Sequence, residues 1–241
     1  MRRSVLTVCV ALGVLFLCGL GTWQIARLQW KLELIERVEG RASGPPVPFA
    51  SVAEEVLSGE FEYGHVSLSG GFPTDQTAHV FGTYQGQPGW FVFQPFSPDG
   101  TDGIGLGVLV NRGFVTEEER QATYVLPDAE RLTGLVRYYE DSTGLADVFA
   151  PPPDLEAGSL YDRRKETFGL AFSHVAGYLE PDAAAADAFL PFYLDSTLPT
   201  QLPRGGTTRL DFSNRHLGYA ITWFGLAGGL IAVYAAMMRR R

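Results

Sequence analysis

The amino-acid sequence predicts a membrane protein in which two transmembrane helices flank a mainly antiparallel β domain, a small barrel or sandwich with a few short helices. Two observations predict this class. No charged residue occurs between Arg3 and Arg27, or between Arg215 and Arg239, near the two ends of the chain. The region between these stretches is rich in runs of β-branched and aromatic residues that glycine and proline interrupt.

The two charge-free stretches, residues 4–26 and 216–238, are predicted to be transmembrane helices. At about 1.5 Å rise per residue each would span roughly 35 Å, which exceeds a hydrocarbon core of about 30 Å. The first stretch could instead be a cleaved signal peptide. Its apolar run over residues 5–20 is longer than a usual signal core, and no small-x-small cleavage site follows it, so we expect an uncleaved anchor.

Arginines at both ends predict the orientation. Arg2 and Arg3 precede the first helix, and Arg239, Arg240 and Arg241 follow the second. By the positive-inside rule, both termini are expected in the cytoplasm or its equivalent, with the domain between the helices on the opposite side. The formal net charge of the chain is −8, and without these arginines the remainder is more acidic still, so we expect no nucleic-acid partner.

The composition excludes several kinds of site. Cys9 and Cys18 both lie in the first apolar stretch, on opposite faces of a helix, so the domain between the helices has neither a disulfide framework nor a thiolate metal site. No hydrolase, phosphate-binding, dinucleotide-binding or zinc-protease motif occurs. The acidic residues are scattered, and we nominate no general acid–base pair. We therefore expect a protein that is not an enzyme.

The periodicity places the elements of the middle domain, residues 41–213. The first helix is expected to continue past the membrane to about residue 40, before Gly44-Pro45-Pro46 ends it. A short helix is expected over residues 165–179, and a surface helix or loop over residues 183–188. Strands are expected over residues 66–70, 78–84, 90–94, 107–115, 132–139, 189–194 and 207–212.

Some polar residues of this domain have ordinary structural interpretations. His65, His79 and His174 are isolated in sequence and are interpreted as surface or edge-strand histidines rather than metal ligands. The segment Asn111-Arg112-Gly113 follows a hydrophobic run. It is interpreted as a strand that ends in a turn, with a carboxylate or partner contact at a rim as the alternative.

The strongest functional candidate lies at the membrane edge. His216 opens the second apolar stretch, on a helix that Ser213 or Asn214 would cap, and Tyr219 and Trp223 follow at spacings that favour one helix face. An ionisable group at the edge of lipid is costly and therefore a functional suspect, and imidazole is a usual ligand of heme iron. Ordinary interfacial aromatics are the alternative interpretation of Tyr219 and Trp223.

Three residues lie at a similar depth. Arg27 and Arg215 could meet the propionates of a heme, and Trp23 belongs to the interfacial aromatics.

Three segments resemble motifs of the Surfeit locus protein one family. They are Gly21-Thr22-Trp23-Gln24-Ile25-Ala26-Arg27 with Lys31, then Val108-Leu109-Val110-Asn111-Arg112-Gly113-Phe114-Val115, and Asn214-Arg215-His216-Leu217-Gly218-Tyr219-Ala220-Ile221-Thr222-Trp223-Phe224. The last is the most specific. Phe114 stands where the family has tryptophan, and Arg215 stands where it has a second asparagine.

The resemblance implies an assembly factor of heme–copper cytochrome c oxidase. It implies a cell inner membrane location with a periplasmic domain, or the organelle equivalent, and a role in supplying heme a to oxidase subunit I. Heme a would come from a heme a synthase. By carry-over, His216 would be the ligand of the heme iron, and Tyr219 and Trp223 would line the heme.

Two other classes of protein are weighed against this one. A membrane scaffold that binds oxidase subunits without a cofactor is the main alternative. A membrane-anchored sensor is disfavoured, because only a few residues lie on the cytoplasmic side.

Overall fold

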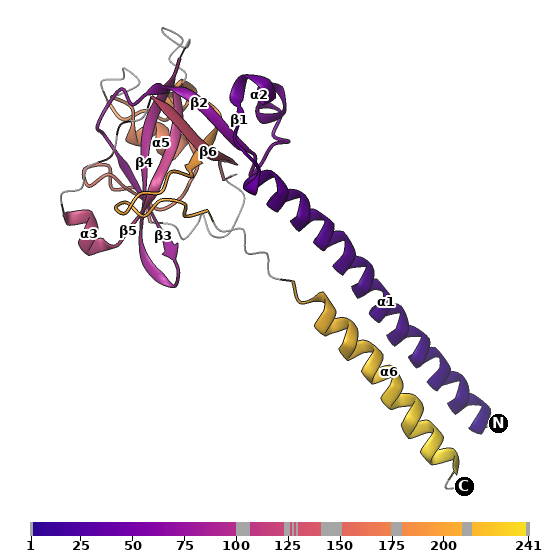
Figure 1. Ribbon diagram of the computed structural model, residues 1–241. Helices are drawn as coiled ribbons and strands as arrows, with labels where there is room; N and C mark the ends of the chain where they lie inside the picture. The colour runs from indigo at the N-terminus through magenta and orange to yellow at the C-terminus, as the bar shows by residue number, and fades with distance from the viewer. Residues whose placement is uncertain are drawn as a thin grey trace. The chain divides into compact units, whose positions relative to one another are not determined.

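Eight strands form one sheet in the part of the chain that the structure describes (Figure 1). The structure is a computed structural model and describes residues 2–99, 107–122, 126, 128, 130–140, 151–174, 180–208 and 214–239. The strands are β1 (Val47–Pro48), β2 (His65–Gly71), β3 (Ala78–Tyr84), β4 (Gln87–Pro98), β5 (Gly107–Val115), β6 (Arg131–Tyr138), β7 (Ser159–Leu160) and β8 (Phe189–Ser196).

Five of these strands close into a barrel. The sheet order is β1-β2-β6-β8-β5-β4-β3-β7, and an additional antiparallel pairing of β2 with β4, through Gly70 and Gly71, completes the ring. Neighbours within the ring are antiparallel except β5 and β8, which are parallel. This connectivity is that of a small Greek-key barrel of the OB type, which confirms the predicted mainly antiparallel β domain.

The barrel has an apolar interior, and a second apolar cluster covers part of its outer face. Every strand of the ring contributes to the interior cluster, which contains Val66, Leu68, Phe96, Val108, Val110, Leu132, Val136, Phe192 and Leu194. The alternate residue Leu109 belongs to a second cluster with Phe93 and Tyr193, which α5 (Lys165–Ala171) covers through Phe168. The two clusters follow from the alternation of side chains along each strand.

Short elements at the edges depart from the predictions. The helices α2 (Phe49–Leu57) and α3 (Glu117–Gln121) and the two-residue strands β1 and β7 were not expected. The helix α5 ends at Ala171, and residues 175–179 of the predicted helix lie outside the described residues. The predicted surface helix or loop over residues 183–188 is a 3-10 helix, η1 (Ala183–Ala188), which is exposed except at Ala185 and Ala186, where it packs inward, and at the half-buried Ala188.

Two of the predicted strands differ most from the observed ones. The strand predicted over residues 90–94 is part of the longer β4. The strand predicted to begin at Thr207 is wrong at its start, because Thr207 and Thr208 have no strand structure, and residues 209–212 lie outside the described residues.

Two long helices complete the described chain. The helix α1 (Arg2–Ser43) ends directly before Gly44-Pro45-Pro46, and α6 is His216–Arg239. Both are long and apolar enough to cross a membrane. Contacts divide the chain into two units, Met1–Glu39 with Leu210–Arg241, and Gly40–Arg209, which contains the barrel.

The segment Asn111-Arg112-Gly113 neither turns nor lies at a rim. It continues β5, and Arg112 is buried, with its guanidinium 4.1 Å from the ring centroid of Phe72 and donating to Gln94 Oε1 at 2.7 Å. Burial lowers the pKa of Arg112, and Asp128 opposes that shift. The predicted turn was therefore wrong, because β5 continues through this segment. Of the alternative, a carboxylate contact is present, since Asn111 donates to Asp195 at 2.8 Å.

At Gly113, the backbone of β5 and the backbone at Arg204 approach each other closely. Its φ is +134°, and a Cβ there would lie 2.4 Å from the carbonyl oxygen of Arg204, which accepts the N–H of Phe114. Replacement by alanine adds backbone strain of about 1–3 kcal/mol and a steric clash. We expect Gly113→Ala to lower the free energy of unfolding by at least about 2 kcal/mol in a urea titration.

The matched control is Gly71→Ala, since a Cβ on Gly71 meets nothing within 4 Å. Equal losses for the two variants would show that Gly113 is not required for the approach.

The lowered pKa of His79 predicts that the stability of the protein depends on pH. Burial, and then the nearby Arg120, lower the pKa of His79 from its ordinary 6.5 to about 4. Between these values the unfolded chain binds more protons than the folded one, so the stability that neutral His79 contributes is complete above about pH 6.5 and falls toward pH 4. We expect His79→Gln to reduce the loss of unfolding free energy between pH 7 and pH 4.5 (roughly the window of that shift).

The exposed His174, changed to Gln, is the control for the substitution itself. A His79→Gln profile parallel to that of the parent would contradict a neutral His79.

Candidate functional site

The two long helices pack against each other in antiparallel directions. The two helices run side by side in Figure 1. Contacts between them join rising residue numbers on α1 to falling residue numbers on α6. In order along α1, the contacts join Thr7 to Tyr234, Gly13 to Leu230, Gly21 to Phe224 and Gln24 to His216. The helices therefore form one unit with a defined register.

The least exposed residues of both helices repeat at spacings of three and four. On α6 they are His216, Ala220, Trp223, Ala227, Leu230, Tyr234 and Met237. On α1, between residues 10 and 24, they are Val10, Gly13, Val14, Leu17, Cys18, Leu20, Gly21 and Gln24. This repeat is typical of two helices that pack along a shared seam at a small crossing angle.

Two glycines allow the helices to approach at this seam. A Cβ on Gly21 would lie 2.7 Å from the ring of Phe224, and one on Gly13 would lie 3.2 Å from Leu230. The other glycines of the two apolar stretches meet nothing within 4 Å. Close backbone contact at small residues is a usual way for apolar helices to associate.

His216 is held by a glutamine of the opposite helix. Its Nδ1 lies 2.8 Å from Oε1 of Gln24, which is only 9 % exposed. Because an amide oxygen only accepts, the imidazole donates from Nδ1, and the lone pair of the neutral ring is on Nε2. Within the described residues Nε2 makes no hydrogen bond. The result is an oriented, half-buried imidazole with one nitrogen available to a ligand.

The start of α6 follows the predicted capping. The side-chain oxygen of Asn214 accepts the N–H of His216 at 3.3 Å, and the carbonyl of Arg215 accepts the N–H of Tyr219. Asn214 thus satisfies an amide at the helix start, as the sequence predicted. Ser213, the alternative cap, lies outside the described residues.

The two aromatic residues predicted to share a face with His216, Tyr219 and Trp223, differ in burial. Trp223 is half-buried and follows His216 on the seam, seven residues along the helix. Tyr219 is 54 % exposed and lies beside the seam rather than on it. The structure therefore brings Trp223, but not Tyr219, onto the face that His216 shares with α1.

The remaining predicted residues are exposed. Trp23 is 58 % exposed, and Arg215 and Arg27 are also exposed. The guanidinium of Arg27 lies 3.9 Å from the ring centroid of Trp30, one helical turn along α1, which is a cation–π contact. Arg27 and Arg215 are cations with exposed side chains, and the described contacts hold neither of them against His216.

Gln24 is the residue that the sequence interpretation missed. It lies in the segment Gly21–Arg27, to which the sequence alone gave no contact for the amide. An amide inside a charge-free helix needs a partner, because an unpaired polar group in an apolar environment costs roughly 2–7 kcal/mol. That cost predicts a polar partner on a neighbouring helix, but only the packing of α1 against α6 identifies it as His216.

Within the described residues no group of three or more histidine, cysteine, aspartate or glutamate side chains comes together. A ligand at this site would therefore be held by the imidazole of His216 and by apolar contacts. Such a single-imidazole site suits a group that brings most of its own coordination sphere, as a porphyrin does.

The fold and the site define a class of protein: a small β-barrel joined to two apolar helices that a histidine–glutamine pair connects. A model of the SURF1 family matches residues 11–228, and the chain belongs to this family.

Relatives in animals and yeast share this similarity. Surfeit locus protein 1 of mouse is 30 % identical over 243 residues, which cover 92 % of this chain and 72 % of the relative. The human protein of the same name is 32 % identical over 230 residues, covering 87 % and 69 %. A yeast protein named cytochrome oxidase assembly protein SHY1 is 31 % identical over 163 residues, covering 65 % and 39 %.

The hydrogen bond to Gln24 predicts the tautomer of His216. In the full chain in lipid nanodiscs, nitrogen-15 NMR of labelled histidine should show His216 protonated on Nδ1. Leucine has a similar volume but accepts no hydrogen bond, so Gln24→Leu should release the ring into a mixture of tautomers. The control is Thr22→Val, because Thr22 bonds only to the carbonyl of Cys18 in its own helix. An unchanged His216 signal in Gln24→Leu would contradict the assignment.

Proposed function

We propose that this protein is an assembly factor of cytochrome c oxidase that binds heme a at His216 and assists its insertion into oxidase subunit I. The observation that supports this most directly is the imidazole oriented by Gln24, with Nε2 available. Membership of the SURF1 family supports the role in assembly, since the yeast relative is named for it. The chain acts in this proposal by binding and releasing its cargo, without catalysing a reaction.

The residues present fit a heme as cargo. A hydrogen bond from Nδ1 to an amide oxygen fixes the ring and raises the basicity of the other nitrogen, which is the usual arrangement for a metal-binding histidine. Around His216, α6 exposes Leu217, Ile221 and Phe224, at 56 %, 65 % and 38 %. This apolar surface suits the face of a porphyrin, and Trp223 adds to it on the seam.

The charged ends of the cargo have candidate partners. Heme propionates are anions, and the exposed side chains of Arg27 and Arg215 carry the cations that stand at the outer ends of the apolar stretches. A guanidinium binds a carboxylate through paired hydrogen bonds. We include both arginines in the site, and Trp23 and Tyr219 as exposed aromatics that border it.

We further propose that α1 and α6 insert together in the cell inner membrane. Both termini would be cytoplasmic and the barrel periplasmic, in keeping with the terminal arginines and the length of each apolar stretch. Heme a would arrive from a heme a synthase in the same membrane. His216 would then receive and release the cargo at the water boundary, where a neutral imidazole binds iron without burying a charge.

The test is the absorption spectrum of the full chain purified after co-expression with a heme a synthase. The parent should show a Soret band, and His216→Ala should lose at least about nine-tenths of it. Gln24→Leu should weaken heme binding about tenfold, because residues that orient a metal ligand typically contribute 10–100-fold in affinity. Arg27→Ala and Arg215→Ala should each weaken it by a smaller factor.

The control for these variants is His174→Ala, whose histidine belongs to the barrel unit. Full heme occupancy in His216→Ala would contradict the ligand assignment. Co-purification of oxidase subunit I with a parent protein that has no Soret band would favour the alternative, a scaffold without a cofactor.

A further inference from the structure

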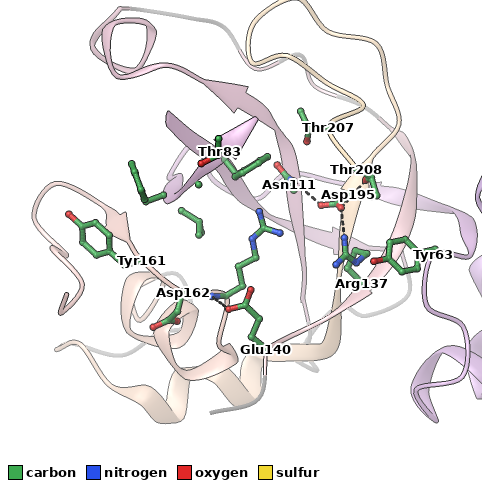
Figure 2. Close-up of a pocket in the computed structure, with 15 residues that line it drawn as sticks. Tyr63, Thr83, Asn111, Arg137, Glu140, Tyr161, Asp162, Asp195, Thr207 and Thr208 are labelled. Atoms are coloured by element: carbon green, nitrogen blue, oxygen red, sulfur yellow. Dashed lines mark hydrogen bonds and ion pairs between the residues drawn. The ribbon is translucent and has the colours of Figure 1, made fainter. Parts of the chain in front are cut away.

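A cavity of about 360 Å³ opens on the outside of the barrel, where β7 separates from β3. The two strands are parallel and pair only at His79 with Ser159 and Val80 with Leu160. Beyond that point the chain segments diverge. The lining of the cavity includes residues 81–83 and residues 161–163, of which Figure 2 labels Thr83, Tyr161 and Asp162, together with Phe91.

The wall formed by β3 is an open strand edge. The N–H of His79 donates to the carbonyl of Gly158 at 2.8 Å, so odd-numbered residues of β3 direct their backbone groups away from β4. Phe81 and Thr83 follow at the same spacing, and β7 has ended before it reaches them. Their backbone N–H and C=O groups therefore face the side on which a longer β7 would have paired.

The opposite wall supplies a guanidinium without an acidic partner. Within the described residues, the guanidinium of Arg163 has no carboxylate within 4.0 Å. It lies 4.7 Å from the ring centroid of Phe91, and one N–H donates to the hydroxyl of Tyr193 at 3.5 Å. A guanidinium has five N–H donors, so Arg163 retains most of its donors for a ligand.

Three of the other charged groups lining the cavity are already paired. Asp195 accepts from Asn111 and Thr208, both at 2.8 Å, and from Arg137 at 3.4 Å, and all of these point toward it in Figure 2. Asp162 is bound to Arg164 at 2.7 Å. Glu140, the fourth, accepts the backbone N–H of Arg163 at 3.3 Å. The guanidinium of Arg163 is therefore the cation of the lining that has no carboxylate partner among the described residues.

Aromatic rings border the open edge. Phe81 is 47 % exposed although it packs against Trp90 and Tyr161, with ring centroids 5.4 and 6.3 Å apart. An exposed aromatic ring beside an unpaired strand edge is a feature of surfaces that accept an added strand.

We propose that this cavity binds an extended segment of another protein, which adds a strand to the edge of β3 at Phe81 and Thr83 and places an acidic side chain against Arg163. Backbone hydrogen bonds to β3 would supply affinity, and the carboxylate would supply specificity. A side chain is assigned to this contact because Arg163 belongs to the opposite wall, whereas the backbone of the added strand is directed at β3. The inference does not depend on heme binding by His216.

The test uses the full chain in lipid nanodiscs and an array of short immobilised peptides that alternate threonine and valine. One series carries a single glutamate at successive positions, a second carries glutamine at the same positions, and a third repeats the glutamate series with an N-methylated backbone. We expect the glutamate series to bind at least about tenfold more tightly than either of the others, because it alone offers both the carboxylate and the backbone groups.

Variants of the two walls test the assignment. Arg163→Gln should remove the preference for glutamate, whereas Arg131→Gln, the matched control at an exposed arginine outside the cavity, should keep it. Thr83→Pro removes the outward N–H and should weaken binding about tenfold, whereas Thr83→Val keeps that N–H and should bind as the parent does. Thermal unfolding checks that each variant is folded, and the N-methylated series tests the backbone pairing even where Thr83→Pro fails to fold.

Several results would overturn the proposal. They are equal binding of the glutamate and glutamine series, equal effects of Arg163→Gln and Arg131→Gln, and no binding by any series. Competition by free glutamate as effective as that by the peptides would assign the cavity to small anions instead.

Discussion

A polar side chain that folding removes from water must keep a partner, and this constraint determines how each unit is held together. In the barrel, Asp195 lies on β8 between β5 and β6 and binds Asn111 and Arg137 on those neighbours. One carboxylate thereby joins the only parallel pair of the ring to the next antiparallel strand. In the helix unit, the same requirement joins Gln24 of α1 to His216 of α6.

In both candidate sites, hydrogen bonds of this kind hold the surrounding polar groups and leave one nitrogen-bearing group able to bind a ligand. The bond from His216 to Gln24 occupies Nδ1 and leaves Nε2, so the ring is oriented before a ligand arrives. In the barrel, Asp195 and Asp162 are paired with other arginines, and Arg163 keeps its donors. Preorganised groups of this kind bind with less loss of conformational freedom than flexible ones, because their rotamers are already fixed. The two sites thus share one physical origin although their proposed ligands differ.

The sequence predicted the long regular elements well and the short ones poorly. Charge-free stretches identified α1 and α6, and alternation identified the central strands, with β3 and β5 placed over the observed ranges. Strands of two residues carry no periodicity, so β1 and β7 had no signal. The motif at Asn111 was misjudged because glycine suggested a turn, whereas Gly113 is needed inside a strand for the close approach of Arg204.

The sequence by itself determined the two apolar helices, the β-rich middle and the candidacy of His216, because these depend on local composition, period and motif. The tertiary structure decided which groups meet. The partner of His216 is 192 residues away in sequence, and no local pattern reports a contact over that distance. The cavity beside Arg163 exists only because β7 ends after two residues and leaves the edge of β3 open. Such features depend on where the pairing between two distant segments ends. The conformational preferences of single residues do not contain that information.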